Sequence, residues 1–506
     1  MRSGPGNRNR SGAGVGPGAG GASTSENSGR SALAGSALVP DAGPTIRRSI
    51  LRARGLIAVA VALALVGGGC GGDDAVDVPA ADSSTPVVVD SDGAFDDLKA
   101  IAYLLQRPDV DVRALTFSGT GIAHCPAAAE NASAVLERIG APDIPVACGR
   151  DEPLSGDNAA LDAWRTAADT LGGVELPEPR PLADTDAPGL LAETVTGSDD
   201  EVVLVALGPL TNVAEALADD PSVAEGIRMV YLMGGAVDAG GNVLYANPDA
   251  EFNIWADPAA AAALFAADVP LTLVPLDATN AVPVTPYHYD AVAAHRDDSA
   301  VSAFLGDYLE ATPLREALYQ WDELAAVIAT DESVATFEDR TLAVVTEGGT
   351  DAGATVEDPA GRPVRVAVAA DQEAFEARFY EAVLGEPEPD VFAWEPDAAV
   401  SSDGAGCTYD GLDPLPPDAL LQIRNDGTDV MAVASGTVAE GTTAADVADF
   451  DTSGSTGVPL WWRAGATILV PVGARDVWPV AGRPDLTILC QTADGEVTHL
   501  AGPFPA

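Results

Sequence analysis

Four acidic residues lie close together in the segment V-V-V-D-S-D-G-A-F-D-D-L, which covers residues 87–98. A short β-branched run leads into these acids and an apolar, helix-like pattern follows them, so the segment predicts a junction between a strand and a helix. Carboxylates this close repel one another unless a cation neutralises them. Oxygen ligands alone suit calcium or magnesium and not zinc. The four acids, Asp90, Asp92, Asp96 and Asp97, therefore predict a hard-metal site.

A simpler interpretation of these acids stays open. Acidic side chains are favoured near a helix N-terminus by the helix dipole, without any bound ligand. The turn at Gly93-Ala94 favours the metal site, because it lets the chain fold back and bring the first and last acids together.

The composition limits the classes of function. The chain has 26 basic and 77 acidic residues, a formal net charge of −51, which argues against nucleic acid as a partner. With 506 residues, 47% of them hydrophobic, it can bury a large core and is long enough for two domains with flanking segments.

Three segments precede the first predicted strand. Residues 1–46 are rich in Gly, Ser, Asn and Arg without apolar periodicity, and predict a disordered extension. Residues 47–70 follow the order of a secretory signal, with arginines, an apolar run and then small residues before Cys70. This end resembles a bacterial lipobox, whose cysteine is lipidated, although Gly67 replaces the usual Leu. Residues 71–84 would then be a tether, and the protein an exported lipoprotein on the outer face of the bacterial cell membrane, held by its lipid anchor only.

An exported protein can form disulfides. Besides Cys70 there are four cysteines, which allow three pairings. Proximity in the sequence favours Cys125 with Cys148 and Cys407 with Cys490, one pair in each predicted domain, and the other pairings stay open.

Between residues 85 and 395, short β-branched runs alternate with helical patterns. This order predicts an α/β fold with a mostly parallel sheet flanked by helices and with ligands at the carboxyl ends of the strands. Residues 400–506 carry shorter strand-like runs between Gly, Asp and Pro turns, and predict an all-β sandwich that resembles immunoglobulin- or cupredoxin-like modules. The expected α/β strands are 87–89, 114–117, 144–147, 201–206, 229–233 and 271–275, and the expected helices include 126–139, 211–218 and 258–266.

Further polar residues follow the later strands. Residues 207–212 read L-G-P-L-T-N, a turn in which Thr211 or Asn212 would cap the next helix. Glu251 and Asn253 lie two residues apart in a segment expected to be extended, so they would face the same way. A carboxylate and an amide together suit the hydroxyls of a sugar.

The order of these motifs resembles the nucleoside hydrolase family, the inosine-uridine-preferring N-ribohydrolases. The opening D-S-D-G-A-F-D-D has Gly93-Ala94 where the family has Pro-Gly, and D-I-P-V, G-P-L-T-N, M-G-G-A, A-E-F-N-I and L-D-A-T-N follow in family order over about 300 residues. The resemblance implies hydrolysis of the N-glycosidic bond of ribonucleosides to free base and ribose. It also implies Ca²⁺ as cofactor, a small-molecule nucleoside as substrate, and leaves open a homo-oligomer formed through the hydrolase-like part.

The resemblance assigns roles to individual positions. It implies that Asp92 is the catalytic base and that Asp90 supports the loop. The positions that match the calcium ligands are Asp92, Asp97, Asp322 and the backbone carbonyl of Leu207. The positions that match ribose-binding residues are Asp96, Glu251, Asn253 and either Asn242 or Asn247.

The resemblance departs at the leaving base. Many family members have a His directly before the late acid, where it protonates the base, but here that residue is Trp321. The purine-preferring branch instead stacks the base between aromatic rings, and Trp321 and Trp164 match those rings. The resemblance therefore implies that purine nucleosides are favoured. A non-catalytic surface lipoprotein that binds nucleosides or sugars is the alternative.

Overall fold

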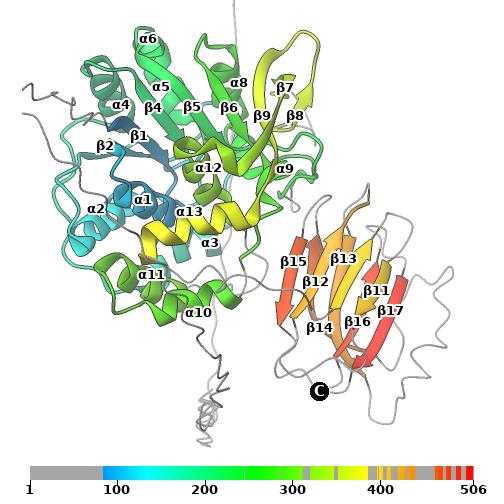
Figure 1. The fold of residues 1–506 in the computed structure, drawn as a ribbon. Helices are drawn as coiled ribbons and strands as arrows, with labels where there is room; N and C mark the ends of the chain where they lie inside the picture. Colours follow the sequence, from blue (N-terminus) through cyan, green and yellow to red (C-terminus); the bar gives the residue numbers. More distant parts are fainter. Residues whose placement is uncertain are drawn as a thin grey trace, which may run out of the picture. The chain divides into compact units, whose positions relative to one another are not determined.

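The computed structural model describes residues 84–385, apart from 244–245, 285, 312–318 and 347–351, together with residue 396 and the C-terminal strands and their flanks (Figure 1). The predicted extension, signal segment and Cys70, and all but the last residue of the predicted tether, lie outside the described residues. Within the described part of the chain, no helix combines the length and the apolar character needed to cross a membrane.

A nine-stranded sheet forms the centre of the α/β part, in the order β3-β2-β1-β4-β5-β6-β9-β7-β8. The first seven strands in this order are parallel, and β7 and β8 extend the sheet with antiparallel pairs. The six strands expected from the sequence are present, and the sequence did not predict the β7, β8 and β9 edge. The strands are β1 Thr85–Ser91, β2 Val110–Phe117, β3 Val146–Cys148, β4 Val202–Ala206, β5 Ile227–Met233, β6 Leu271–Val274, β7 Ala335–Val344, β8 Thr355–Glu357 and β9 Arg362–Ala370.

Helices cover both faces of this sheet, as the continuous apolar runs of its strands require. Alternate residues of β1 enter two separate cores: Val87 and Val89 pack on the face of α1, α2, α11, α12 and α13, and Val88 packs on the face of α4, α5 and α8. The helices are α1 Asp97–Gln106, α2 Ala127–Ile139, α3 Asp162–Asp169, α4 Ala187–Thr196, α5 Thr211–Asp219, α6 Val223–Gly226, α7 Phe252–Ala256, α8 Pro258–Ala266, α9 Leu276–Thr279, α10 Pro286–Ala294, α11 Ala300–Ala311, α12 Trp321–Thr330 and α13 Gln372–Leu384.

The strand order reverses between β1 and β4. The chain runs from β1 outward through β2 and β3, then returns to place β4 on the other side of β1. Asp90 lies opposite Ala206 in this pairing, and its carbonyl accepts a 2.7 Å hydrogen bond from the N–H of Leu207. Such a reversal leaves a crevice at the carboxyl ends of the two strands, where α/β proteins bind ligands.

The expected helix cap at 211–212 is wrong. Neither side chain caps α5, because Thr211 donates to Asp257 at 2.8 Å and Asn212 donates to Asp90 at 2.8 Å. Both polar groups are thus used to connect α5 to neighbouring segments. Asp257 itself caps α8, where Pro258 occupies the first helical position.

The C-terminal strands form two four-stranded sheets, β11-β10-β12-β15 and β14-β13-β16-β17. All neighbouring strands are antiparallel except β10 and β12. The Cys407–Cys490 disulfide joins one sheet to the other, and Cys125–Cys148 lies in the α/β part. The strands are β10 Ala398–Ser402, β11 Cys407–Gly411, β12 Leu420–Asn425, β13 Met431–Val438, β14 Trp462–Val470, β15 Arg475–Pro479, β16 Leu486–Gln491 and β17 Val497–Phe504.

Candidate active site at the ends of β1 and β4

Three acids from the starts of two helices meet near the carboxyl end of β1. Asp96 and Asp97 begin α1, Asp322 lies in the first turn of α12, and the two helices pack against each other. One carboxylate oxygen from each residue lies within 4.8 Å of the other two. Asp97 and Asp322 are buried and Asp96 is half-buried. This grouping can supply several oxygen ligands to one hard cation.

Asp92 lies beside this group and is bonded to it. Its backbone N–H donates to Oδ1 of Asp97 at 3.1 Å, and its carboxylate accepts from the N–H groups of Ala94 and Ile122, each at 3.1 Å. The tightest group of oxygens therefore contains Asp96, where the family resemblance implied Asp92. Oδ2 of Asp97 is buried without a hydrogen-bond partner among the described residues. A buried carboxylate oxygen without a partner is costly, and a cation would satisfy it.

The electrostatics of the group favour cation binding. Burial raises the pKa of Asp92, Asp97 and Asp322, and repulsion from neighbouring carboxylates raises the pKa of Asp92 and of Asp322 further. Burial, followed by repulsion from Glu323, raises the pKa of Asp96 to about 8. Acids held this close without a cation retain protons, which a bound metal would displace.

A buried ion pair, not predicted from the sequence, lies beside the acids. Lys99 of α1 pairs with Glu323 of α12, and both side chains are almost fully buried. The pair connects the two helices that carry Asp97 and Asp322. Its signal in the sequence was a charge at each of two positions within otherwise apolar helical patterns.

Asp90 occupies a separate, fully buried position in β1. One of its oxygens accepts hydrogen bonds from Thr116 of β2 at 2.6 Å and from Asn212 of α5 at 2.8 Å. Burial nevertheless raises its pKa to about 7. These contacts fix the end of β1 between its two neighbours, and neither Thr116 nor Asn212 was singled out for this role from the sequence.

The segment with Glu251 and Asn253 is helical, so the expectation of an extended segment is wrong. Glu251 caps α7, accepting from the N–H groups of Asn253 at 2.8 Å and Ile254 at 3.2 Å, and it also accepts from Gly235 at 2.9 Å. Burial raises its pKa to about 7. The amide of Asn253 donates to the carbonyl of Leu207 at 2.8 Å, which brings three of the expected site residues together.

The two asparagines of the preceding loop bind backbone. Asn242 accepts from the N–H of Phe252 at 2.9 Å, at the start of α7. Asn247 is buried, donates to the carbonyl of Ala352 at 2.9 Å and accepts from the N–H of Asp249 at 3.0 Å. Asn242 is therefore the one bonded to the helix that carries Asn253.

The two tryptophans differ in their surroundings. Trp321 is half-buried, lies next to Asp322 at the start of α12, and has its ring centroid 5.6 Å from that of Tyr319. Its indole N–H is buried and has no hydrogen-bond partner among the described residues. Trp164 of α3 is 40% exposed, whereas the next residue, Arg165, is buried. The sequence reasoning singled out Trp164 and missed Arg165.

Three of the four histidines pair with acids outside the cluster. The pairs are His124 with Asp169, His288 with Glu376, and His295 with Asp298. The fourth, His499, lies in β17. The residue directly before Asp322 is Trp321, so an indole lies where many family members have the imidazole of a histidine.

Comparison with known proteins identifies the fold and the family. The sequence profile described as "Inosine-uridine preferring nucleoside hydrolase" matches residues 87–377. A solved plant nucleoside hydrolase, PpNRh1, superposes with a TM-score of 0.54 at 31% identity, covering 60% of this chain and 99% of that chain. A purine-preferring ribonucleoside hydrolase from Gardnerella vaginalis gives 0.52 at 28%, covering 60% and 98%.

Curated relatives match a shorter stretch. A probable uridine nucleosidase 1 from Oryza sativa subsp. japonica is 36% identical over 199 residues, which is 39% of this chain and 60% of that protein. A pyrimidine-specific ribonucleoside hydrolase, RihA, from Photobacterium profundum is 36% identical over 198 residues, 39% and 62% respectively. The chain thus spans about 60% of the length of these curated relatives. From the profile match and the fold, the chain belongs to the inosine-uridine preferring nucleoside hydrolase family.

Proposed function

We propose that this protein hydrolyses the N-glycosidic bond of ribonucleosides and depends on calcium to do so. The observation that carries the proposal is the meeting of Asp96, Asp97 and Asp322 within 4.8 Å, with Asp92 bonded to Asp97, at the strand reversal of a nucleoside hydrolase fold. A site for binding alone would not need a group that activates water, such as Asp92.

The residues present fit a hard divalent cation. They offer only oxygen donors, and one of these, Oδ2 of Asp97, is buried without a partner among the described residues. Asp97 and Asp322 would hold the ion, together with Asp92 and the Leu207 carbonyl, which the family resemblance implies, and the Asp96 carboxylate lies beside them. When bound, calcium would fix the ribose 2′- and 3′-hydroxyls and make the attacking water more acidic.

The protein's own side chains would perform the remaining steps. Asp92 takes a proton from the attacking water, and the fixed N–H groups of Ala94 and Ile122 orient its carboxylate. Asp96, Glu251, Asn253 and Asn242 would bind the ribose hydroxyls. As the bond to the base breaks, positive charge develops on the sugar, and the surrounding carboxylates stabilise it.

We further propose that purine nucleosides are favoured. Trp321 presents a large ring directly beside Asp322 and close to Tyr319, a suitable surface for stacking a purine. One solved relative is named purine-preferring, whereas several curated relatives are named for uridine or pyrimidines. The proposed preference for purines therefore rests on Trp321, and a direct comparison of purine and pyrimidine nucleosides tests it.

The experiment is a nucleoside panel with and without calcium. Purified protein, stripped of metal with a chelator, is incubated with inosine, guanosine, uridine or cytidine, and released ribose is measured before and after calcium is added. We expect release only with calcium, and faster release from inosine and guanosine. Equal turnover of uridine would contradict the purine preference. Saturable nucleoside binding without release would favour the non-catalytic binding lipoprotein.

We also propose that the chain is exported and anchored through a lipid on Cys70. The support is the order of basic, apolar and small residues before this cysteine. Labelled fatty acid should be incorporated by the wild-type chain in a bacterial host and not by a Cys70→Ser variant. Incorporation by both forms would contradict the assignment.

A further inference from the structure

Residues 118–125, between β2 and α2, form a loop that closes over Asp92, and we call it the Asp92 loop. The N–H of Ile122 donates to Oδ2 of Asp92 at 3.1 Å, and the N–H of Ala123 donates to the backbone carbonyl of Asp92 at 3.0 Å. The approach is close, because a Cβ on Gly121 would lie 2.1 Å from the same Oδ2. The loop therefore sets the position of a carboxylate oxygen that the proposed reaction uses.

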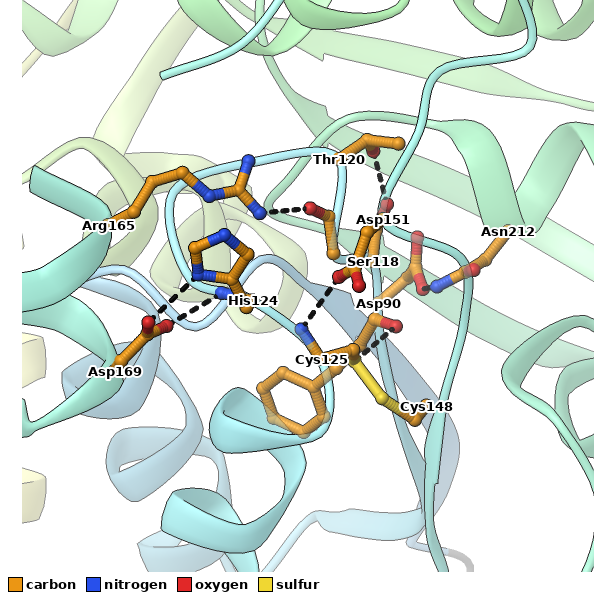
Figure 2. Close-up of a disulfide and its surroundings, with 12 residues drawn as sticks. Asp90, Ser118, Thr120, His124, Cys125, Cys148, Asp151, Arg165, Asp169 and Asn212 are labelled. Atoms are coloured by element: carbon orange, nitrogen blue, oxygen red, sulfur yellow. Dashed lines mark hydrogen bonds and ion pairs between the residues drawn. A yellow bond between two sulfur atoms is a disulfide. The ribbon is translucent and has the colours of Figure 1, made fainter. Parts of the chain in front are cut away.

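Other segments hold the backbone of this loop through non-covalent contacts, which Figure 2 shows. The side chains that make these contacts lie outside β2. Asp151 is exposed, Asp169 is half-buried and Arg165 is buried. The bonds are Arg165 Nη2 to the Gly119 carbonyl at 2.6 Å, the His124 N–H to Asp169 at 2.8 Å, and the Cys125 N–H to Asp151 at 3.0 Å.

One connection of the Asp92 loop is covalent. Cys125, its last residue, forms a disulfide with Cys148 at the end of β3 (Figure 2). β3 is a three-residue strand at the edge of the sheet, and among the described strands it pairs with β2 alone. The loop begins directly after β2, and the disulfide adds a second covalent connection, from the last residue of the loop to β3.

We propose that the Cys125–Cys148 disulfide positions Asp92 for metal binding and catalysis, by keeping the Asp92 loop closed on its carboxylate. The proposal rests on the proposed hydrolase function. Reduction by a dithiol transfers two electrons and two protons to the disulfide, breaks the sulfur–sulfur bond and leaves two thiols. The loop then keeps only its non-covalent contacts, so the N–H groups of Ile122 and Ala123 leave Asp92 more often. Calcium binding weakens while the fold persists.

The second disulfide provides a matched control. In a full-length Cys407→Ser/Cys490→Ser variant that also carries Cys70→Ser, Cys125–Cys148 is the only cysteine pair left. This protein is compared before and after dithiothreitol treatment, and with a Cys125→Ser/Cys148→Ser/Cys70→Ser variant. The measurements are calcium affinity by calorimetry, amide exchange of residues 118–125, circular dichroism, and kcat and KM with inosine.

Reduction, or loss of Cys125 and Cys148, should weaken calcium binding at least about tenfold, as is typical when a group that orients a metal ligand is removed. Exchange at Ile122 and Ala123 should rise, kcat should fall, and circular dichroism should stay unchanged. Reoxidation should restore all values.

Equal calcium affinity and equal exchange in the oxidised and reduced forms would overturn the proposal. Loss of the folded spectrum on reduction would also overturn it, because the disulfide would then stabilise the whole domain and would not specifically position Asp92. Calcium affinity and amide exchange are measured without turnover. Failure to cleave any nucleoside would therefore contradict the proposed function, but it would not change the outcome of this test.

Discussion

The backbone N–H of Asp92 donates a hydrogen bond to Oδ1 of Asp97, 3.1 Å away, across the turn between β1 and α1. One oxygen of Asp97 is therefore used inside the protein, and the other is available to a ligand. Oδ1 of Asp97 thus has a structural role, and Oδ2 is the oxygen that can bind a ligand.

Asp97→Asn should test this separation. The amide can still accept from Asp92, but it lacks the charge that a calcium ion needs. We expect calcium affinity and kcat to fall at least about 100-fold with the fold retained. The control is Asp143→Asn, the same substitution at an exposed loop residue, which should change neither calorimetric affinity nor activity. Wild-type calcium affinity in Asp97→Asn would contradict the assigned ligand role.

The calcium-free protein should lose stability as the pH rises. The pKa of Asp90 is raised from 3.8 to about 7 and that of Asp96 to about 8, so the folded state binds protons more tightly than the unfolded state. Their contribution is complete below pH 3.8 and is lost as the pH passes through these raised values. Metal-free protein should therefore melt at a higher temperature at about pH 5.5 than at about pH 8.

The effect of Asp90 can be isolated by Asp90→Asn, which should reduce the difference in melting temperature between the two pH values. Calcium should stabilise the wild type more at the higher pH, because the ion competes with protons for the same oxygens. A metal-free protein that is more stable at about pH 8 would contradict the expectation.

Substitutions of Trp321 should separate stacking from simple packing. Trp321→Leu should raise KM for inosine about tenfold, since stacking on an aromatic ring stabilises a bound base by about 1–3 kcal/mol. Trp321→Phe keeps a ring and should lose less. Steady-state kinetics with inosine and uridine provide the measurement, and an equal rise in KM for both nucleosides would argue against a purine-stacking role.

The buried pair of Lys99 and Glu323 should show strong coupling. Lys99→Met leaves Glu323 as an uncompensated buried acid and should cost about 3–5 kcal/mol of unfolding free energy. The double variant Lys99→Met/Glu323→Met removes both charges and should recover most of that loss. Urea denaturation of Lys99→Met, Glu323→Met and the double variant measures the coupling. Additive losses would mean that the two charges do not stabilise each other.

The central strands and the acids at the junction of β1 and α1 were predictable from the sequence because their signals are local, whereas Asp322 was assigned only through the family resemblance. Asp90, Asp92, Asp96 and Asp97 occur within eight residues, and a β-branched run precedes them. The α7 helix was not predictable in this way, since five residues are too few to show a helical period. Glu251 and Asn253 were accordingly assigned to an extended segment.

Contacts between distant segments were also beyond the sequence. Lys99 and Glu323 pair only because α1 and α12 pack together, and a single charge in an apolar pattern does not identify its partner. Arg165 follows Trp164, which was predicted to stack on the base. In the structure the arginine is buried, whereas Trp164 is 40% exposed. The orientation of so short a helix depends on tertiary packing.

The placement of Asp92 at the end of β1 and of Asp322 at the start of α12 has a consequence for biosynthesis. The two residues are 230 positions apart, so a growing chain that ends before α12 carries the first acids without the last one. Such a chain would lack part of the proposed calcium site, and it would not gain the full stabilisation that the bound ion would give. Under the proposed calcium dependence, stabilisation by the ion could begin only after the chain has been synthesised through α12, with β7, β8, β9 and α13 still to follow.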